Sequence, residues 1–153
     1  MERSLGRVDQ VEGLWPVDGP HDGVSVVEAA GAVAVLARYL AHATHAVHRA
    51  PESAPQVYRC LTALSGGLWS LSQSVRQVAG RMEVLADASE LYADRLGSPA
   101  DPVDLALGTA DLTGHAGGLL AQAADVLGHA ASSASRLGHR DLSAGEEGDG
   151  SDG

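Results

Sequence analysis

Four residue types are missing from this chain of 153 residues: phenylalanine, isoleucine, lysine and asparagine. All ten basic residues are therefore arginine. Aromatic residues make up only 3% of the chain, so any core must be built from aliphatic and small side chains. The missing types have AT-rich codons, which favours a genome of very high GC content, of the actinobacterial type. Selection for an arginine-bearing surface is the alternative explanation.

Cysteine and long apolar runs are also scarce. Cys60 is the single cysteine, which excludes an intramolecular disulfide and fits a reducing cytoplasm. The longest apolar stretch, 29–37, is broken by Gly31, and residues 1–13 lack the apolar run of a signal peptide. A membrane span needs about 20 apolar residues. We therefore expect no membrane span and a cytoplasmic location.

Positive charge is sparse as well. The formal net charge is −10, and basic residues form no patch that could follow a phosphate backbone. The same negative charge opposes binding to anionic lipid surfaces. Nucleic acid is therefore excluded as an expected partner.

An apolar seam runs through the middle of the chain in steps that alternate between four and three residues. Its members are Val57, Leu61, Leu64, Leu68, Leu71, Val75, Val78, Met82, Leu85, Ser89, Tyr92 and Leu96. A repeat of about 3.5 residues covers one side of an α-helix and needs other helices to bury it. The seam predicts an all-α protein with a long central helix.

Cap and turn residues divide the chain into three expected helices. The first covers 25–50, with Ser25 as its N-cap and Glu28 completing a capping box. The second covers 53–96, and the third covers 101–137. Short connections force neighbouring helices to be antiparallel. The sequence thus predicts an up-down-up antiparallel three-helix bundle, which occupies residues 24–138.

Both ends of the chain differ from this bundle. Residues 1–23 are punctuated by Pro16 and Pro20 and predict a flexible arm, in which Trp15 could anchor a short amphipathic turn. Residues 139–153 are rich in glycine, serine and carboxylates. No apolar group there could offset the entropy of ordering, so a disordered acidic tail is predicted.

The faces expected to meet in the bundle follow from the same spacing. The expected inner residues of the first helix are Val26, Ala30, Val33, Ala37, Leu40, Thr44 and Val47, and those of the third are Leu105, Leu112, Leu119 and Val126. Small residues beside the seam would let a neighbour approach: Ser65, Ser72, Ala79, Ala86 and Ala93. The seam keeps its register across Gly66-Gly67, which favours a continuous or kinked helix over a loop.

Candidate interaction residues lie on the expected outer faces. A cationic ridge consists of Arg38, His42, His45 and Arg49, and an acidic ridge consists of Glu83, Asp87, Glu90 and Asp94. The ridges would lie at opposite ends of one bundle, so they could pair between two copies; ordinary solvated faces are the alternative. Trp69 lies off the seam, where it would either contact a partner or pack under the N-terminal arm.

Metal and catalytic sites have weaker support. His42, His45 and His48 recur at a spacing of three, so two could share a metal, but the expected packing places them on the solvated face. Two carboxylate–imidazole pairs have a spacing of four and are expected to be surface pairs: Asp111 with His115, and Asp125 with His129. Cys60 has no base beside it in the sequence and is expected to be a half-buried structural thiol. We predict no catalytic, cofactor-binding or metal site.

The sequence therefore favours a non-catalytic helical interaction or structural module. It would act through self-association, such as a homodimer, or through binding of a protein partner. The alternatives are a secreted small helical substrate or its partner, and a histidine-based metal-binding bundle. An enzyme is not expected, because no acid, base or nucleophile points inward in the predicted bundle.

Overall fold

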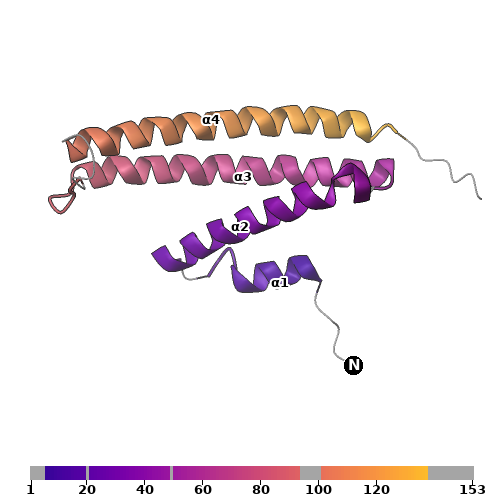
Figure 1. Cartoon of the computed structure of the whole chain (residues 1–153), viewed down its shortest axis with the longest axis horizontal. Coiled ribbons are helices and arrows are strands. Elements are labelled where there is room, and N and C mark those ends of the chain that lie inside the picture. Colours follow the sequence, from indigo (N-terminus) through magenta and orange to yellow (C-terminus); the bar gives the residue numbers. More distant parts are fainter. Residues whose placement is uncertain (1–5, 20, 49, 94–100, 138–153) are drawn as a thin grey trace, which may run out of the picture. The chain divides into compact units, whose positions relative to one another are not determined.

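The computed structural model describes residues 6–19, 21–48, 50–93 and 101–137. Within these ranges the chain forms helices and no strand, so the predicted all-α class is confirmed. The helices are α1 (Arg7–Leu14), α2 (Gly23–Ala43), the short 3-10 helix η1 (Ala46–His48), α3 (Ala54–Ala86) and α4 (Pro102–Ala134) (Figure 1). They belong to two units, Met1–Ala50 and Pro51–Gly153, which are described separately. Arg49, Asp94 and the expected acidic tail, 139–153, lie outside the described residues.

The N-terminal unit holds α1 and α2. Helix α1 lies within the segment where the sequence predicted an arm. Helix α2 begins earlier than predicted, because Asp22 rather than Ser25 is its N-cap. The Asp22 carboxylate accepts a 2.7 Å hydrogen bond from the Ser25 backbone N–H, and the Asp22 N–H donates to Ser25 Oγ. The bond from the Ser25 backbone lowers the pKa of Asp22, since it stabilises the charged carboxylate.

Helix α2 also ends earlier than predicted, at Ala43 rather than near residue 50. The Thr44 hydroxyl donates to the Leu40 carbonyl at 2.8 Å, and the Thr44 N–H shares that acceptor. The backbone then tightens, because the His45 N–H bonds the His42 carbonyl and the His48 N–H bonds the His45 carbonyl. Such bonds over three residues replace the α-helical pattern with a 3-10 turn. The predicted helix over 25–50 is therefore wrong in its last turns.

Helix α3 is continuous through Gly66-Gly67, as the register of the seam favoured. Its start at Ala54 agrees with the prediction, and Ser53 is its N-cap, although the Ser53 side chain makes no capping hydrogen bond. Instead, the Gln56 side chain accepts a 2.7 Å hydrogen bond from the Glu52 N–H. Helix α4 begins as predicted, with Asp101 as N-cap accepting from the Val103 N–H at 2.8 Å.

Helices α3 and α4 form an antiparallel hairpin (Figure 1). Ser65 Oγ donates to the Ala124 carbonyl at 2.8 Å, and Ser72 Oγ donates to the Gly117 carbonyl at 2.8 Å. Residues further along α3 thus meet residues earlier in α4, which fixes the antiparallel direction. The hairpin confirms one half of the expected bundle packing.

Small residues make the contact between α3 and α4. The buried positions are Ser72, Ala79 and Ala86 on α3, and Ala106, Ala110, Gly117, Ala121, Ala124, Ala131 and Ala134 on α4. The three on α3 are among the small residues predicted to admit a neighbour. Alanine and glycine let two helix backbones approach closely enough for serine hydroxyls to reach carbonyl oxygens of the opposite helix.

The larger apolar residues lie beside this contact rather than in it. No described residue of the leucine-valine seam, which the structure covers from Val57 to Tyr92, is buried, and Leu64 and Val78 are exposed. The predicted inner stripe of α4 is also wrong, since Leu112 is 75% exposed and Val126 is 66% exposed. A side chain of that size cannot fit between helices that meet through alanine and glycine, so the seam is displaced to a flank.

Helix α3 ends at Ala86, ten residues before the predicted end near Leu96. The reason lies in the hairpin, where the pairing of Ser72 with Gly117 places Ala86 opposite the first turn of α4. Asp101 and Pro102 fix the start of α4 by capping it and by favouring the first helical position. Beyond Ala86 the helix would have no partner on α4, and the described seam residues beyond Leu85, Ser89 and Tyr92, are not helical. Both helices have the same length, 33 residues.

The close approach of the two helices predicts opposite effects for two neighbouring glycines. A Cβ added at Gly117 would lie 2.8 Å from Arg76 Cγ and 3.3 Å from the Ser72 carbonyl oxygen, whereas one added at Gly118 meets nothing within 4 Å. We expect Gly118→Ala to raise the free energy of unfolding by about 1 kcal/mol through helix propensity. Gly117→Ala should be less stable than Gly118→Ala by about 1–3 kcal/mol because of overpacking. Urea denaturation followed by circular dichroism measures both, and equal stabilisation would contradict the close contact.

Candidate functional site

The surface with the strongest recognition chemistry is one flank of the hairpin, here called the Trp69 flank. Its α3 members follow steps of four, three, four and seven residues: Tyr58, Thr62, Ser65, Trp69 and Arg76. The α4 residues beside its first part are small, namely Gly128, Ser132 and Ser135, and with Tyr58 they line an open pocket of about 310 Å³. This pocket therefore lies between α3 and α4, with Tyr58 on its α3 side.

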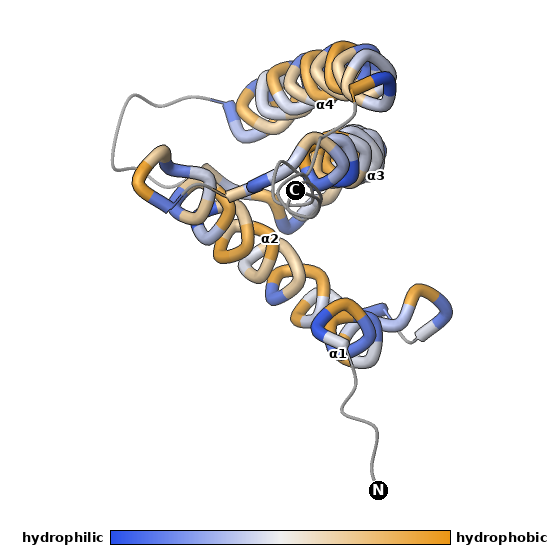
Figure 2. Tube along the Cα trace, turned by 90° about the vertical axis from the view of Figure 1, so that its right-hand side faces the viewer, coloured by the Kyte–Doolittle hydropathy of each residue, from blue (hydrophilic) through white to orange (hydrophobic). Residues whose placement is uncertain are grey.

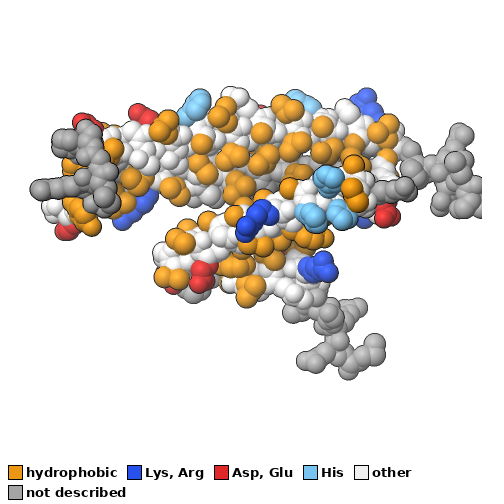
Figure 3. Space-filling view, in the orientation of Figure 1, with side chains coloured by type: hydrophobic (Ala, Val, Ile, Leu, Met, Phe, Trp, Pro, Cys, Tyr) orange, Lys and Arg blue, Asp and Glu red, His pale blue; other side chains and the backbone are white. Residues whose placement is uncertain are grey.

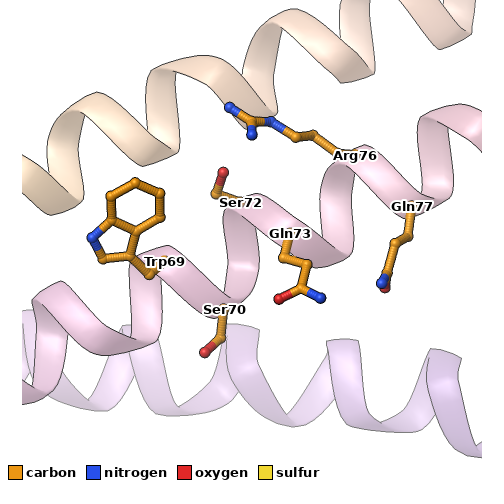
Figure 4. Close-up of a pocket in the computed structure, with 6 residues that line it drawn as sticks. All are labelled: Trp69, Ser70, Ser72, Gln73, Arg76 and Gln77. Carbon is orange, nitrogen blue, oxygen red and sulfur yellow. The ribbon is translucent and has the colours of Figure 1, made fainter.

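A second open pocket, of about 530 Å³, lies around Trp69 (Figure 4). Its lining comes entirely from α3: Trp69, Ser70, Ser72, Gln73, Arg76 and Gln77. Trp69, Ser72 and Arg76 extend toward α4, whereas Ser70 and Gln77 point away from it (Figure 4). The Trp69 side chain is 47% exposed, so the hairpin itself leaves half of the indole uncovered.

Rigid contacts hold the base of this pocket. Ser72 is 1% exposed, and its hydroxyl is bonded to the Gly117 carbonyl. The absence of a side chain at Gly117 leaves room for the aliphatic part of Arg76, whose Cγ lies where a Cβ would otherwise reach. Arg76 and Trp69 are therefore presented from a fixed helix, which limits the entropy that binding would remove.

The opposite flank is apolar. Met82 of the α3 seam and Leu105 of the α4 stripe line one small pocket together with Thr109, so these side chains lie on the same side of the hairpin. We call this surface the apolar flank; its exposed members include Leu64, Val78 and Leu105. Leu112, Leu119 and Val126 lie two residues from buried positions of α4, so they are on the side of α4 that faces away from α3. Figure 3 shows hydrophobic side chains gathered along α3 and α4. Sequence analysis found these residues but assigned them to the core.

The two predicted ridges are not built as continuous helical surfaces. Of the acidic ridge, Glu83 lies on α3, Asp87 is the C-cap, and Glu90 lies beyond the helix. Of the cationic ridge, Arg38 and His42 lie on α2, while His45 follows the end of the helix. Because both helices end early, the spacing that would align each ridge is lost. Pairing of the ridges therefore has no geometric support among the described residues.

The remaining polar candidates are exposed and scattered. Both carboxylate–imidazole pairs of α4 are on its solvated surface, namely Asp111 with His115 and Asp125 with His129. Cys60 is half-buried and unpaired with another cysteine, as expected. No group of three or more histidine, cysteine, aspartate or glutamate side chains is arranged to hold a metal within the described ranges.

One contact between candidate residues was missed by sequence analysis. The rings of His42 and His48 lie with centroids 4.9 Å apart at an interplanar angle of 57°. In a continuous helix a spacing of six residues points two side chains in different directions. The Thr44 hydroxyl gives no usable signal for the end of the helix, because Thr62 and Thr109 make the same bond to a carbonyl four residues back inside continuous helices.

Helix α2 is apolar along most of its length (Figure 2). It has 21 residues, a mean hydropathy of 1.6 over its most apolar window, and no buried residue in that window. Its length and composition thus meet the requirement for crossing a membrane, which sequence analysis did not expect. A signal sequence and the core helix of a soluble bundle meet the same requirement.

Comparison with known protein families, curated proteins and solved structures finds no match to this chain.

Proposed function

We propose that this chain is a non-catalytic helical interaction module that binds a protein partner through the Trp69 flank. The observation that carries the proposal is the half-exposed indole of Trp69 in an open pocket beside Arg76. Tryptophan, tyrosine and arginine supply most of the binding energy in protein interfaces. Tyr58 lies on the same flank and is also exposed, so the three residue types form one row on a rigid helix.

The partner is either another protein or a second copy of this chain. A site-specific photo-crosslink distinguishes the two, because the mass of the adduct identifies the molecule that is captured. Gln73 lines the Trp69 pocket and is exposed, so replacing it with p-benzoylphenylalanine places the crosslinker at the surface.

Truncation of Trp69 should weaken competition for this adduct. We expect excess wild-type chain to compete with the crosslinking chain, and Trp69→Ala to compete about 30-fold less well, as for a central interface residue. The matched control is Trp15→Ala, which removes the other tryptophan and should compete as the wild type does. Equal competition by Trp69→Ala would mean that recognition lies elsewhere.

We further propose that α2 covers the apolar flank of its own chain and completes an up-down-up bundle. Three observations support this. The apolar flank has no cover within the hairpin, α2 has an exposed stripe that includes Val26, Val33 and Leu36, and the connection 44–53 is short. Two exposed apolar stripes on one chain gain about 25 cal/mol for each Å² that they bury against each other.

A disulfide test checks this arrangement. An antiparallel pairing of α2 with α3 places Val33 at the level of Leu64, so Val33→Cys with Leu64→Cys should oxidise within one chain in a Cys60→Ser background. The matched control is Val33→Cys with Ala63→Cys, which lies at the same level on the exposed side of α3. Non-reducing gel electrophoresis and mass spectrometry show which disulfide forms and whether it lies within one chain or between two. A bond formed only between chains would assign the apolar flank to a second copy, and equal oxidation of both pairs would contradict the proposed face.

Membrane insertion of α2 is the second candidate, favoured by its 21 apolar-rich residues, none of which is buried. At 1.5 Å per residue the helix is about 32 Å long, which matches the hydrocarbon core of a bilayer. In that case the chain would resist carbonate extraction from membranes, and the disulfide between positions 33 and 64 would not form. We expect instead that the chain is found in the soluble fraction after carbonate extraction. Release of the chain into the medium would support the secreted alternative.

A further inference from the structure

Two potential metal ligands, His42 and His48, approach each other at the end of α2. The rings of His42 and His48 have centroids 4.9 Å apart. Both side chains are exposed, so their nitrogens are open to solvent. The pair lies wholly within the N-terminal unit and does not depend on the hairpin.

Backbone bonds fix the pair. The His45 N–H bonds the His42 carbonyl at 3.1 Å, and the His48 N–H bonds the His45 carbonyl at 2.8 Å. These two consecutive turns bring residue 48 back to residue 42. The ring of His45 between them is engaged with its own turn, since its Nδ1 accepts a long hydrogen bond from the Val47 N–H at 3.5 Å.

The separation of the rings fits two imidazoles on one ion. A zinc–nitrogen bond is about 2.0–2.1 Å long, and the ring centroid lies about 1.1 Å beyond the nitrogen. Two rings at tetrahedral or right angles around an ion therefore have centroids about 4.5–5.2 Å apart. The observed 4.9 Å between the His42 and His48 centroids falls in this range.

We propose that His42 and His48 bind a divalent transition-metal ion of the kind that prefers imidazole, with Zn²⁺ as the representative. Hard cations such as Mg²⁺ and Ca²⁺ are disfavoured, because they require oxygen ligands. No third histidine, cysteine or carboxylate joins the pair within the described ranges, so water completes the coordination. The site is therefore an open one with two protein ligands, and it is independent of the Trp69 flank.

The test is calorimetric titration of the untagged full chain with ZnCl₂. We expect saturable binding of one ion per chain, weakened about tenfold or more by His42→Ala and by His48→Ala, since each removes one of two ligands. His45→Ala should bind as the wild type does, which separates this pair from a row of three ligands. The double variant His115→Ala with His129→Ala controls for binding to exposed histidines elsewhere.

Nuclear magnetic resonance of the imidazole nitrogens gives a second measurement. Zn²⁺ should shift the ring nitrogens of His42 and His48 and leave those of His115 and His129 unchanged. The proposal is overturned if titration shows no saturable binding, if binding survives the loss of either member of the pair, or if His45→Ala or the control double variant weakens binding equally. Because all these side chains are exposed, helicity measured by circular dichroism should be unchanged in each variant.

Discussion

The close approach of α3 and α4 through small residues is the constraint on which the rest of the described hairpin depends. Ser72 meets Gly117 with no side chain between the two backbones, and the serine hydroxyl reaches the opposite carbonyl at 2.8 Å. Side-chain hydrogen bonds to a neighbouring helix also fix the register, since a slip of one residue would leave a buried hydroxyl without a partner. The equal length of the two helices follows, because each ends near the point where the other begins.

This mode of packing buries little apolar area. The largest fully buried side chain is that of Ser72, and the other buried positions are nearly all alanine. Leucine and valine, which would contribute most to stability when buried, remain on the flanks. A hairpin of this kind gains stability mainly when something else covers its apolar flank. The hairpin has one apolar flank and one flank with tryptophan, tyrosine and arginine. We therefore expect the first to pack against another helix and the second to bind a partner.

The helical class, the start of α4 and the continuity of α3 could all be predicted, because each rests on a local signal. Asp101 and Pro102 are strong start signals, and the unbroken register across Gly66-Gly67 outweighs the low helix propensity of glycine. The identity of the buried face could not be predicted from periodicity, since the seam and the small-residue stripe have the same repeat. The end of α3 could not be predicted from a local signal either, because it is set by the residue at which α4 begins. The His42–His48 contact needed the early end of α2, which no glycine or proline marks.

The placement of charge on α2 favours a protein surface over a bilayer as its environment. Glu28 and Arg38 are ten residues apart, and with His42 they share the outer side of the helix, opposite Val33. A bundle would bury the side of Val33 and leave these polar groups in water. A bilayer would surround all sides, and each charged group near the middle of a span costs about 2.5–3.5 kcal/mol. The residues opposite the charges are valine, alanine and leucine in steps of three and four, which is the pattern that helix packing requires and that a lipid environment does not.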